Sequence, residues 1–291
     1  MISNQTKGTV VVDGFSLDYC MEGRGIPTLI IGSNRFYARA FSKELREHLQ
    51  LIFMDHRGFV APPEEPLENS AYALDILLQD IEALRRHLNL EQFLIVGHSG
   101  HAFMALEYAK KFPQHVLGSV MIGVSPDYSE AMHQATDAFF ETTASAERKD
   151  LYAKNMAKLP GLIQAKPEKR FVDYCLCAGP RNWFQYDFDA AALWEGVETN
   201  MQMIDYVWGK VFRDIDITKD LDKLEKPVLL ALGKYDYVTG PPSLWDKVVP
   251  VFKHIQVELF EESAHYPQFE QPAEFDEKLL AWAIENKLID N

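Results

Sequence analysis

A serine, an aspartate and a histidine each follow an apolar run in this sequence. Ser99 stands in GHSGH after the run that begins at Phe93, Asp236 follows the run that ends at Leu232, and His265 follows the run over 255–261. A serine hydroxyl is a weak nucleophile at neutral pH, so it needs a histidine to take its proton and a carboxylate to orient that histidine. The three residues together predict acyl transfer through a covalent serine intermediate.

Strands and helices must bring these residues together. Short apolar runs alternate with longer amphipathic segments, which predicts strands joined by helices around a mostly parallel sheet, an α/β fold. The predicted strands are a hairpin over 8–14 and 15–23, followed by 28–33, 51–58, 93–99, 116–123, 227–236 and 255–263. Predicted helices lie near 80–88, 104–111, 242–249 and 272–286. Sites in such sheets lie at the carboxyl ends of the strands, where the three residues are expected to meet.

The segment around Ser99 predicts a sharp turn from strand to helix. Gly97 and Gly100 are small enough for such a turn, which lifts the serine hydroxyl above the sheet edge. The helix that begins behind it presents N–H groups to negative charge. His101 stands where the G-x-S-x-G pattern has its second glycine. For His98 and His101 we favour packing beside the turn over a role as ligand or base.

The chain resembles the α/β-hydrolase superfamily, in particular the capped branch of proline iminopeptidase-like and haloperoxidase-like serine hydrolases. The resemblance rests on LIIGSN (29–34), MDHRG (54–58), DIEALRRHLNLEQFLIVGHSG (80–100), ALEYAKKFP (105–113), PVLLALGKYD (227–236) and SAHYPQFEQPAEF (263–275). It implies an α/β-hydrolase fold with Ser99 as nucleophile, His265 as base and Asp236 as its orienting acid.

The resemblance also implies an oxyanion hole and a structural turn beside it. The backbone N–H groups of Gly100 and Ser33 would bind the oxygen of the tetrahedral intermediate, with Asn34 as a side-chain helper. Asp55 and Arg57 match the family's Asp-x-Arg-Gly turn, and we interpret them as structural partners near the site.

The domain organisation follows from a change in pattern after the sixth strand. Residues 126–216 have no convincing strand but carry Met, Trp, Phe and Tyr at helical spacings, which predicts a helical cap. The hydrolase core is expected in two parts, 1–125 and 217–291.

Substrate specificity is expected to reside in this cap, because small-molecule sites are mainly apolar with a few polar anchors. Trp183, Trp194 and Trp208 are candidates to line the pocket. Glu195 and Glu198 are candidates to hold a substrate ammonium group, although a solvated surface position is the commoner fate of such residues.

Composition excludes several classes of function. The chain has 291 residues with a formal net charge of −14, which argues against a nucleic-acid partner. No apolar run approaches the roughly 18 residues that a membrane span needs, and the amino-terminal sequence lacks a signal-peptide pattern. We therefore expect a cytoplasmic protein without a membrane partner.

The three cysteines, Cys20, Cys175 and Cys177, suggest no structural zinc site. Cys175 and Cys177 are one residue apart, and two small buried side chains are favoured over a metal or redox pair. We expect no metal and no organic cofactor.

The sequence therefore predicts a serine hydrolase that cleaves a small ester, an amide or a short peptide, including an aminopeptidase of the proline iminopeptidase type. A lactonase or a carbon–carbon bond hydrolase on the same triad stays open. So does a ligand-binding receptor with slow turnover, which His101 in the turn favours. The protein is expected to be a monomer or a homodimer.

Overall fold

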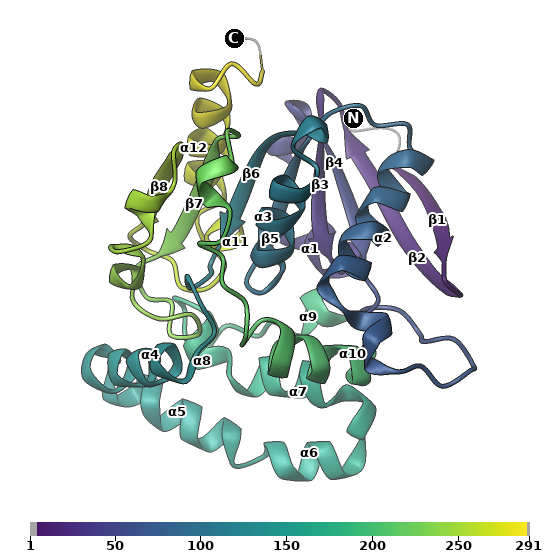
Figure 1. The fold of residues 1–291 in the computed structure, drawn as a ribbon. Helices are drawn as coiled ribbons and strands as arrows, with labels where there is room; N and C mark the ends of the chain where they lie inside the picture. The colour runs from purple at the N-terminus through teal and green to yellow at the C-terminus, as the bar shows by residue number, and fades with distance from the viewer. Residues whose placement is uncertain (1–4, 290–291) are drawn as a thin grey trace.

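An eight-stranded sheet forms the centre of the protein (Figure 1). The computed structural model describes residues 5–289. The strands are β1 Thr6–Val12, β2 Phe15–Gly23, β3 Ile26–Gly32, β4 Leu49–Asp55, β5 Phe93–His98, β6 Val116–Ile122, β7 Val228–Gly233 and β8 Ile255–Phe260, and their order in the sheet is β1-β2-β4-β3-β5-β6-β7-β8. The pairs β1–β2 and β2–β4 are antiparallel, and every other pair is parallel. The predicted hairpin and mostly parallel sheet are confirmed.

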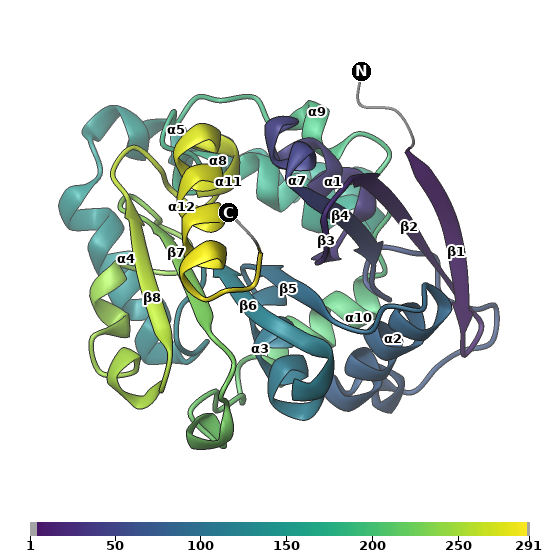
Figure 2. The ribbon, with the colours of Figure 1, turned by 90° about the horizontal axis from the view of Figure 1, so that it is seen from above.

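Helices cover both faces of the sheet, which is why its inner strands are mostly apolar. All residues of β5 and of β7 are buried. Successive residues of one strand face opposite sides, so that Leu29 and Ile31 belong to one apolar cluster and Ile30 to the other. The first cluster includes helices α2 (Leu74–His87) and α3 (His101–Lys111), and the second includes α1 (Asn34–Ala40) and α12 (Pro272–Glu285). Figure 2 shows these two pairs of helices on opposite sides of the sheet.

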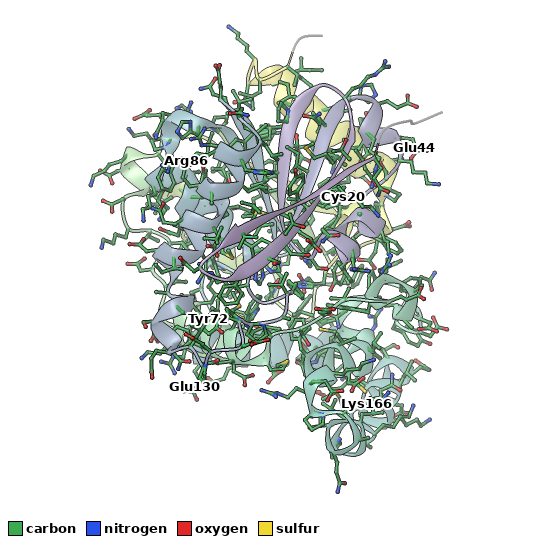
Figure 3. The ribbon with its side chains drawn as sticks, turned by 90° about the vertical axis from the view of Figure 1, so that its right-hand side faces the viewer. Cys20, Glu44, Tyr72, Arg86, Glu130 and Lys166 are labelled. Atoms are coloured by element: carbon green, nitrogen blue, oxygen red, sulfur yellow. The ribbon has the colours of Figure 1, made fainter. Side chains whose placement is uncertain are left out.

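A group of helices follows β6 and precedes β7. Its members are α4 Glu130–Thr143, α5 Ala146–Met156, α6 Leu159–Ala165, α7 Arg170–Cys177, α8 Gly179–Asn182, α9 Ala191–Trp194, α10 Met201–Tyr206 and a turn of π-helix, η5 Val207–Val211. We call residues 130–211 the helical insertion. Figure 1 shows it as a layer below the sheet, and Figure 3 shows Lys166 on its outer part, far from Arg86 on α2. A helical insertion after the sixth strand was expected, and the fold has one.

The predicted helix over 242–249 is wrong. This segment forms two short 3-10 helices, η7 Pro242–Trp245 and η8 Val249–Val251. Pro250 directly follows the predicted segment, and its ring crowds the carbonyl group four residues earlier, at Asp246, which disfavours an α-helical last turn. None of the helices within residues 5–289 has the length and apolar composition of a membrane span.

Candidate active site

Ser99 lies in the turn between β5 and α3. Its backbone has a φ of 55°, a left-handed conformation that is uncommon for a residue other than glycine, and its N–H donates to the carbonyl of Ile122 at 2.8 Å. A side chain at Gly97 would meet the carbonyl oxygen of His101 at 2.2 Å, and one at Gly100 would meet the ring of Phe212 at 2.7 Å. The turn therefore requires a glycine at position 97, while Gly100 leaves room for the Phe212 ring. The strained strand-to-helix turn around Ser99 has the geometry that the sequence predicted.

Asp236 and His265 come from the loops after β7 and β8 and form a hydrogen bond. The Nδ1 atom of His265 lies 2.8 Å from Oδ2 of Asp236. Asp236 also accepts from the Thr239 hydroxyl at 2.6 Å, from the Thr239 N–H at 3.0 Å and from the Val238 N–H at 2.8 Å. Burial alone would raise the pKa of Asp236, but His265 and these donors outweigh it and hold the pKa below its usual value. Asp236 thus stays a carboxylate, accepts the hydrogen of His265 Nδ1, and leaves Nε2 to accept a proton.

The main chain around His265 is held by residues that sequence reasoning did not single out. Its N–H donates to the carbonyl of Asn182 in the helical insertion at 3.0 Å. The N–H groups of Ala264 and Tyr266 both donate to Oε2 of Glu270, at 2.8 and 3.2 Å. A third N–H, from Phe184 in the insertion, donates to Oε1 of Glu270 at 2.5 Å. Burial raises the pKa of Glu270 to about 7. Only the position of Glu270 five residues after His265 could have signalled this role.

Ser33 and Gly100, the expected oxyanion donors, each precede a helix. Ser33 is the N-cap of α1, where its hydroxyl accepts from the Phe36 N–H at 3.3 Å, and Gly100 is the N-cap of α3. Within residues 5–289, the backbone N–H of neither residue donates to another backbone group. Both groups therefore remain free to donate to a substrate oxygen.

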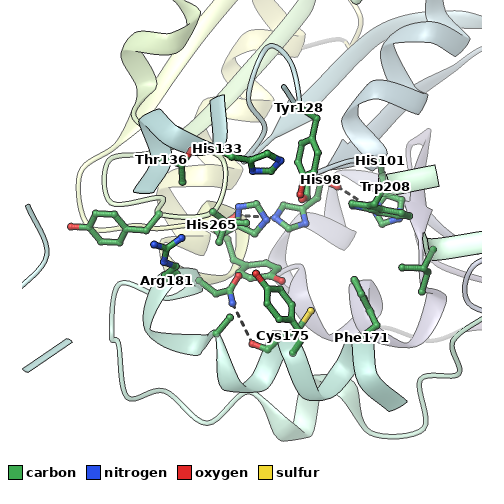
Figure 4. A pocket seen from close by; sticks show the side chains of 18 of the residues that line it. His98, His101, Tyr128, His133, Thr136, Phe171, Cys175, Arg181, Trp208 and His265 are labelled. Carbon is green, nitrogen blue, oxygen red and sulfur yellow. Dashed lines mark hydrogen bonds between the residues drawn. The ribbon is translucent and has the colours of Figure 1, made fainter. Parts of the chain in front are cut away.

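Ser99, His265 and Ser33 line one cavity of about 880 Å³ between the sheet and the helical insertion. Figure 4 shows His265 near its middle, with Arg181 on one side and Trp208 on the other. Phe36, Phe59 and Phe171 add apolar wall. The cavity thus has room for a small organic molecule beside the serine and the histidine.

A family model described as alpha/beta hydrolase fold matches residues 24–272. The chain belongs to the alpha/beta hydrolase family. The predicted superfamily resemblance is confirmed, and the protein is an enzyme of the hydrolase class.

Relatives of this alpha/beta hydrolase include several named proteins. The AB hydrolase superfamily protein YclE of Bacillus subtilis is 44% identical over 270 residues, covering 93% of this chain and 96% of that protein. A proline iminopeptidase of Heyndrickxia coagulans is 22% identical, covering 93% and 96% of the two chains. The crystal structure of a proline iminopeptidase from Mycobacterium smegmatis matches with a TM-score of 0.71 at 16% identity, covering 97% of this chain and 99% of that one. This structural match shows the fold alone.

The three tryptophans expected to line the pocket of this hydrolase are placed differently. Trp194 and Trp208 line the cavity. Trp183 does not, because it is 2% exposed and stacks on the ring of Tyr266 with centroids 4.3 Å apart. Tyr266 lines the cavity, and Trp183 packs against the side of the Tyr266 ring that faces away from it.

Glu195, Glu198 and Asn34 do not line the cavity, and their expected substrate contacts need correction. Glu195 and Glu198 are exposed, in the segment that follows α9. Their charges stay hydrated there, so they incur no desolvation cost. The Asn34 amide donates to Oδ2 of Asp55 at 2.5 Å, and its N–H donates to Oδ1 at 2.6 Å, which turns the side chain toward the end of β4. Arg57 pairs with buried Asp80 at 2.6 Å, as a structural partner would.

Three other carboxylates line the cavity: Glu130, Asp137 and Asp205. Asp137 accepts from Arg181 at 2.7 Å, and Asp205 pairs with Arg170. Glu130 is exposed at the start of α4. Each of them is thus neutralised by an arginine or solvated.

The cysteines show no metal site. Cys177 is buried, and Cys175 is partly buried and lines the cavity, where burial raises the pKa of its thiol to about 12. Within residues 5–289 there is no group of three His, Cys, Asp or Glu side chains arranged to hold a metal ion.

Proposed function

We propose that this enzyme is a serine hydrolase that cleaves a small carboxylic ester or amide through an acyl-enzyme. Ser99 attacks the carbonyl carbon while Nε2 of His265 takes the hydroxyl proton. Asp236 stabilises the imidazolium that forms. The backbone N–H groups of Gly100 and Ser33 bind the oxyanion. His265 then returns the proton to the leaving group, and a water molecule activated by His265 releases the acyl group.

The observation that carries this proposal is the buried hydrogen bond from His265 to Asp236, because His265 lines the same cavity as Ser99. It fixes the imidazole in the tautomer whose free nitrogen acts as a base. Asp236 is a buried carboxylate with four hydrogen-bond donors around it. Burying a charge is costly, so stability alone does not account for this arrangement, whereas a catalytic role does. The strained backbone of Ser99 supports the same assignment.

We also propose that the helical insertion is the active-site cap, with the boundaries expected from sequence, 126–216. Residues of α4, α7, α10 and η5 line the cavity opposite the sheet. The cap therefore determines which substrates enter.

An uncharged ester is favoured as substrate over an aminoacyl amide. An aminopeptidase must hold a substrate ammonium group, which requires a carboxylate that is free to pair with it. Asp137 and Asp205 already pair with Arg181 and Arg170, and Glu195 and Glu198 lie outside the cavity. Glu130 alone keeps the aminopeptidase as a second candidate, which the similarity to proline iminopeptidases also supports.

A panel of p-nitrophenyl acyl esters of rising length and aminoacyl p-nitroanilides tests this choice. We expect turnover of esters by the wild type, none by Ser99→Ala, and at most weak turnover of the aminoacyl amides. Glu198→Gln serves as a matched control for Glu130→Gln, because only Glu130 lines the cavity. Preferred cleavage of aminoacyl amides, lost in Glu130→Gln alone, would establish the aminopeptidase instead. No Ser99-dependent turnover on either class would favour the binding receptor.

A further inference from the structure

A line of hydrogen bonds through four buried side chains passes beside Ser99. We call it the histidine chain, and its members are His56, His101, Tyr37 and His98. Nε2 of His56 lies 2.7 Å from Nε2 of His101. The Tyr37 hydroxyl lies 3.2 Å from Nδ1 of His101 and 3.0 Å from Nδ1 of His98.

Both ends of the histidine chain finish on the main chain. At one end, Nε2 of His98 lies 2.8 Å from the carbonyl oxygen of His265. At the other, the Gly58 N–H donates to Nδ1 of His56 at 2.8 Å. Between them, Nδ1 of His101 lies 3.1 Å from the carbonyl oxygen of His98.

The donors and acceptors follow from the end at His265. A carbonyl oxygen only accepts, so Nε2 of His98 carries a hydrogen, and in a neutral ring Nδ1 then accepts from the Tyr37 hydroxyl. Nδ1 of His101 faces the His98 carbonyl and must also carry a hydrogen. Nε2 of His101 then accepts from Nε2–H of His56.

The opposite end requires the same assignment independently. The Gly58 N–H can only donate, so Nδ1 of His56 has no hydrogen, and a neutral His56 carries its hydrogen on Nε2. Every hydrogen in the chain therefore points in one direction. All three imidazoles are neutral in this arrangement, and a second proton on His56 or on His101 would place two N–H donors against each other.

The surroundings of the chain favour neutral rings. His56, His98 and His101 are each 4% exposed or less. The rings of Phe59 and Trp208 pack on His56 and His101. Burial lowers the pKa of His56 to about 3 and lowers those of His98 and His101 well below the usual value.

The chain joins the loops that carry the proposed catalytic groups. Tyr37 lies on α1, and its N–H donates to the carbonyl oxygen of Ser33 at 3.0 Å. His98 and His101 flank Ser99 in the elbow, and His98 also holds the carbonyl of His265. His265 thus has its N–H fixed by Asn182 and its carbonyl fixed by His98.

We propose that His56, His101, Tyr37 and His98 form a one-directional hydrogen-bonded chain that positions the oxyanion loop, the nucleophile elbow and the His265 loop relative to one another. Its members are positioning residues, and the proposal rests on the proposed function of Ser99 and His265. His101, in place of the usual glycine, links the His56 turn to the elbow rather than marking a receptor.

Tyr37→Phe tests the middle of the chain, because it removes one hydroxyl and keeps the ring. Tyr19→Phe is the matched control: the Tyr19 hydroxyl also bonds a histidine, His87 at 3.3 Å, but between β2 and α2. We expect kcat for a p-nitrophenyl ester to fall about ten-fold or more in Tyr37→Phe with KM within about two-fold, since misplaced catalytic groups slow the chemical step. Tyr19→Phe should keep its kcat. Equal kcat in the two variants, both folded by circular dichroism, would overturn the proposal.

His56 gives a second test that does not depend on the folding of Tyr37→Phe. Glutamine places an amide N–H near the position of Nε2, whereas leucine has no donor. We expect His56→Gln to keep kcat within about three-fold of the wild type and His56→Leu to lose about ten-fold. The same loss in both variants would mean that His56 serves packing alone.

The direction of the chain is directly visible by ¹⁵N NMR of the histidine rings at pH 7. We expect neutral rings with the hydrogen on Nε2 in His56 and His98 and on Nδ1 in His101. A charged ring, or His101 with its hydrogen on Nε2, would contradict the assignment. If the wild type fails to react with a fluorophosphonate, the proposed function fails; if it reacts but Tyr37→Phe reacts as fast, only the positioning role fails.

Discussion

His265 Nδ1 lies 2.8 Å from Asp236 Oδ2, and both side chains are 4% exposed. The donors of Thr239 and Val238, together with His265, keep the pKa of Asp236 below its usual value, so Asp236 is the acceptor in this hydrogen bond. Nδ1 therefore donates to Asp236, and Nε2 is the ring nitrogen that this hydrogen bond does not use. The loops after β7 and β8 therefore hold the proposed base and its proposed orienting acid as one unit.

Asp236→Asn should leave the fold intact and nearly abolish activity. The asparagine amide favours the wrong tautomer of His265, so kcat on the preferred ester should fall about 10³–10⁴-fold. Asp246→Asn, at an exposed position after the same strand, is the control and should keep wild-type kcat. Steady-state kinetics decides the matter, and an Asp236→Asn variant with more than a tenth of wild-type kcat would argue against this role.

Glu270→Gln should reduce both stability and activity in a pH-dependent way. Glutamine has one oxygen, whereas both Glu270 oxygens accept backbone N–H groups. The folded pKa of about 7 lies above the unfolded value near 4.5, so the folded state binds more protons between these values. The contribution of Glu270 to the free energy of unfolding therefore falls as the pH rises through this window, by about 2–3 kcal/mol.

Urea unfolding of wild type and Glu270→Gln at pH 5 and pH 8 measures this change. The difference between the two proteins should be larger at pH 5. Burial also raises the pKa of Asp55 to about 7, but Asp55 is present in both proteins, so its contribution cancels in the difference between them. A difference that is constant or grows with pH would show that Glu270 is ionised throughout.

Gly97→Ala should disrupt the elbow, because its methyl group would lie 2.2 Å from the His101 carbonyl oxygen. We expect a loss of about 2–4 kcal/mol in the free energy of unfolding. Gly161→Ala in α6 is the matched control, with nothing within 4 Å of the added methyl group, and should be neutral or slightly stabilising. Thermal unfolding compares the two, and equal midpoints would mean that the turn relaxes without cost.

Trp208→Ala should change which esters are cleaved fastest. Trp208 lies in the π-helical turn η5, and its ring atom Cε2 is 3.0 Å from where a side chain on Gly100 would begin, next to the proposed oxyanion donor. Its removal opens the cavity there. We expect kcat/KM to rise for long acyl chains relative to acetyl, by about ten-fold. An unchanged ratio across the ester panel would place the acyl group at the other end of the cavity.

The hydrolase core was predictable because its pattern is simple. Fully buried apolar strands and turn residues at their carboxyl ends place Ser99, Asp236 and His265 at one edge of the sheet with no knowledge of side-chain contacts. The elbow follows from the two glycines around Ser99. The α-helix expected over 242–249 is absent, because apolar periodicity alone does not distinguish an α-helix from short 3-10 helices.

The specificity residues were less predictable because helical spacing does not say which face meets the core. Trp194 and Trp208 line the cavity, whereas Trp183 packs behind it, although all three are aromatic residues of one segment. Glu270 and Tyr37 were missed for a different reason. Their roles depend on hydrogen bonds that form only once distant loops meet, such as that between Tyr37 and His98, 61 residues apart.

The most direct test of the central claim is the intact mass of the protein after treatment with a fluorophosphonate, followed by peptide mapping. The account predicts a single adduct on Ser99, absent in Ser99→Ala and formed far more slowly in Asp236→Asn, since only an activated serine reacts at a useful rate. A folded wild-type protein without an adduct, or with the adduct on another residue, would contradict it.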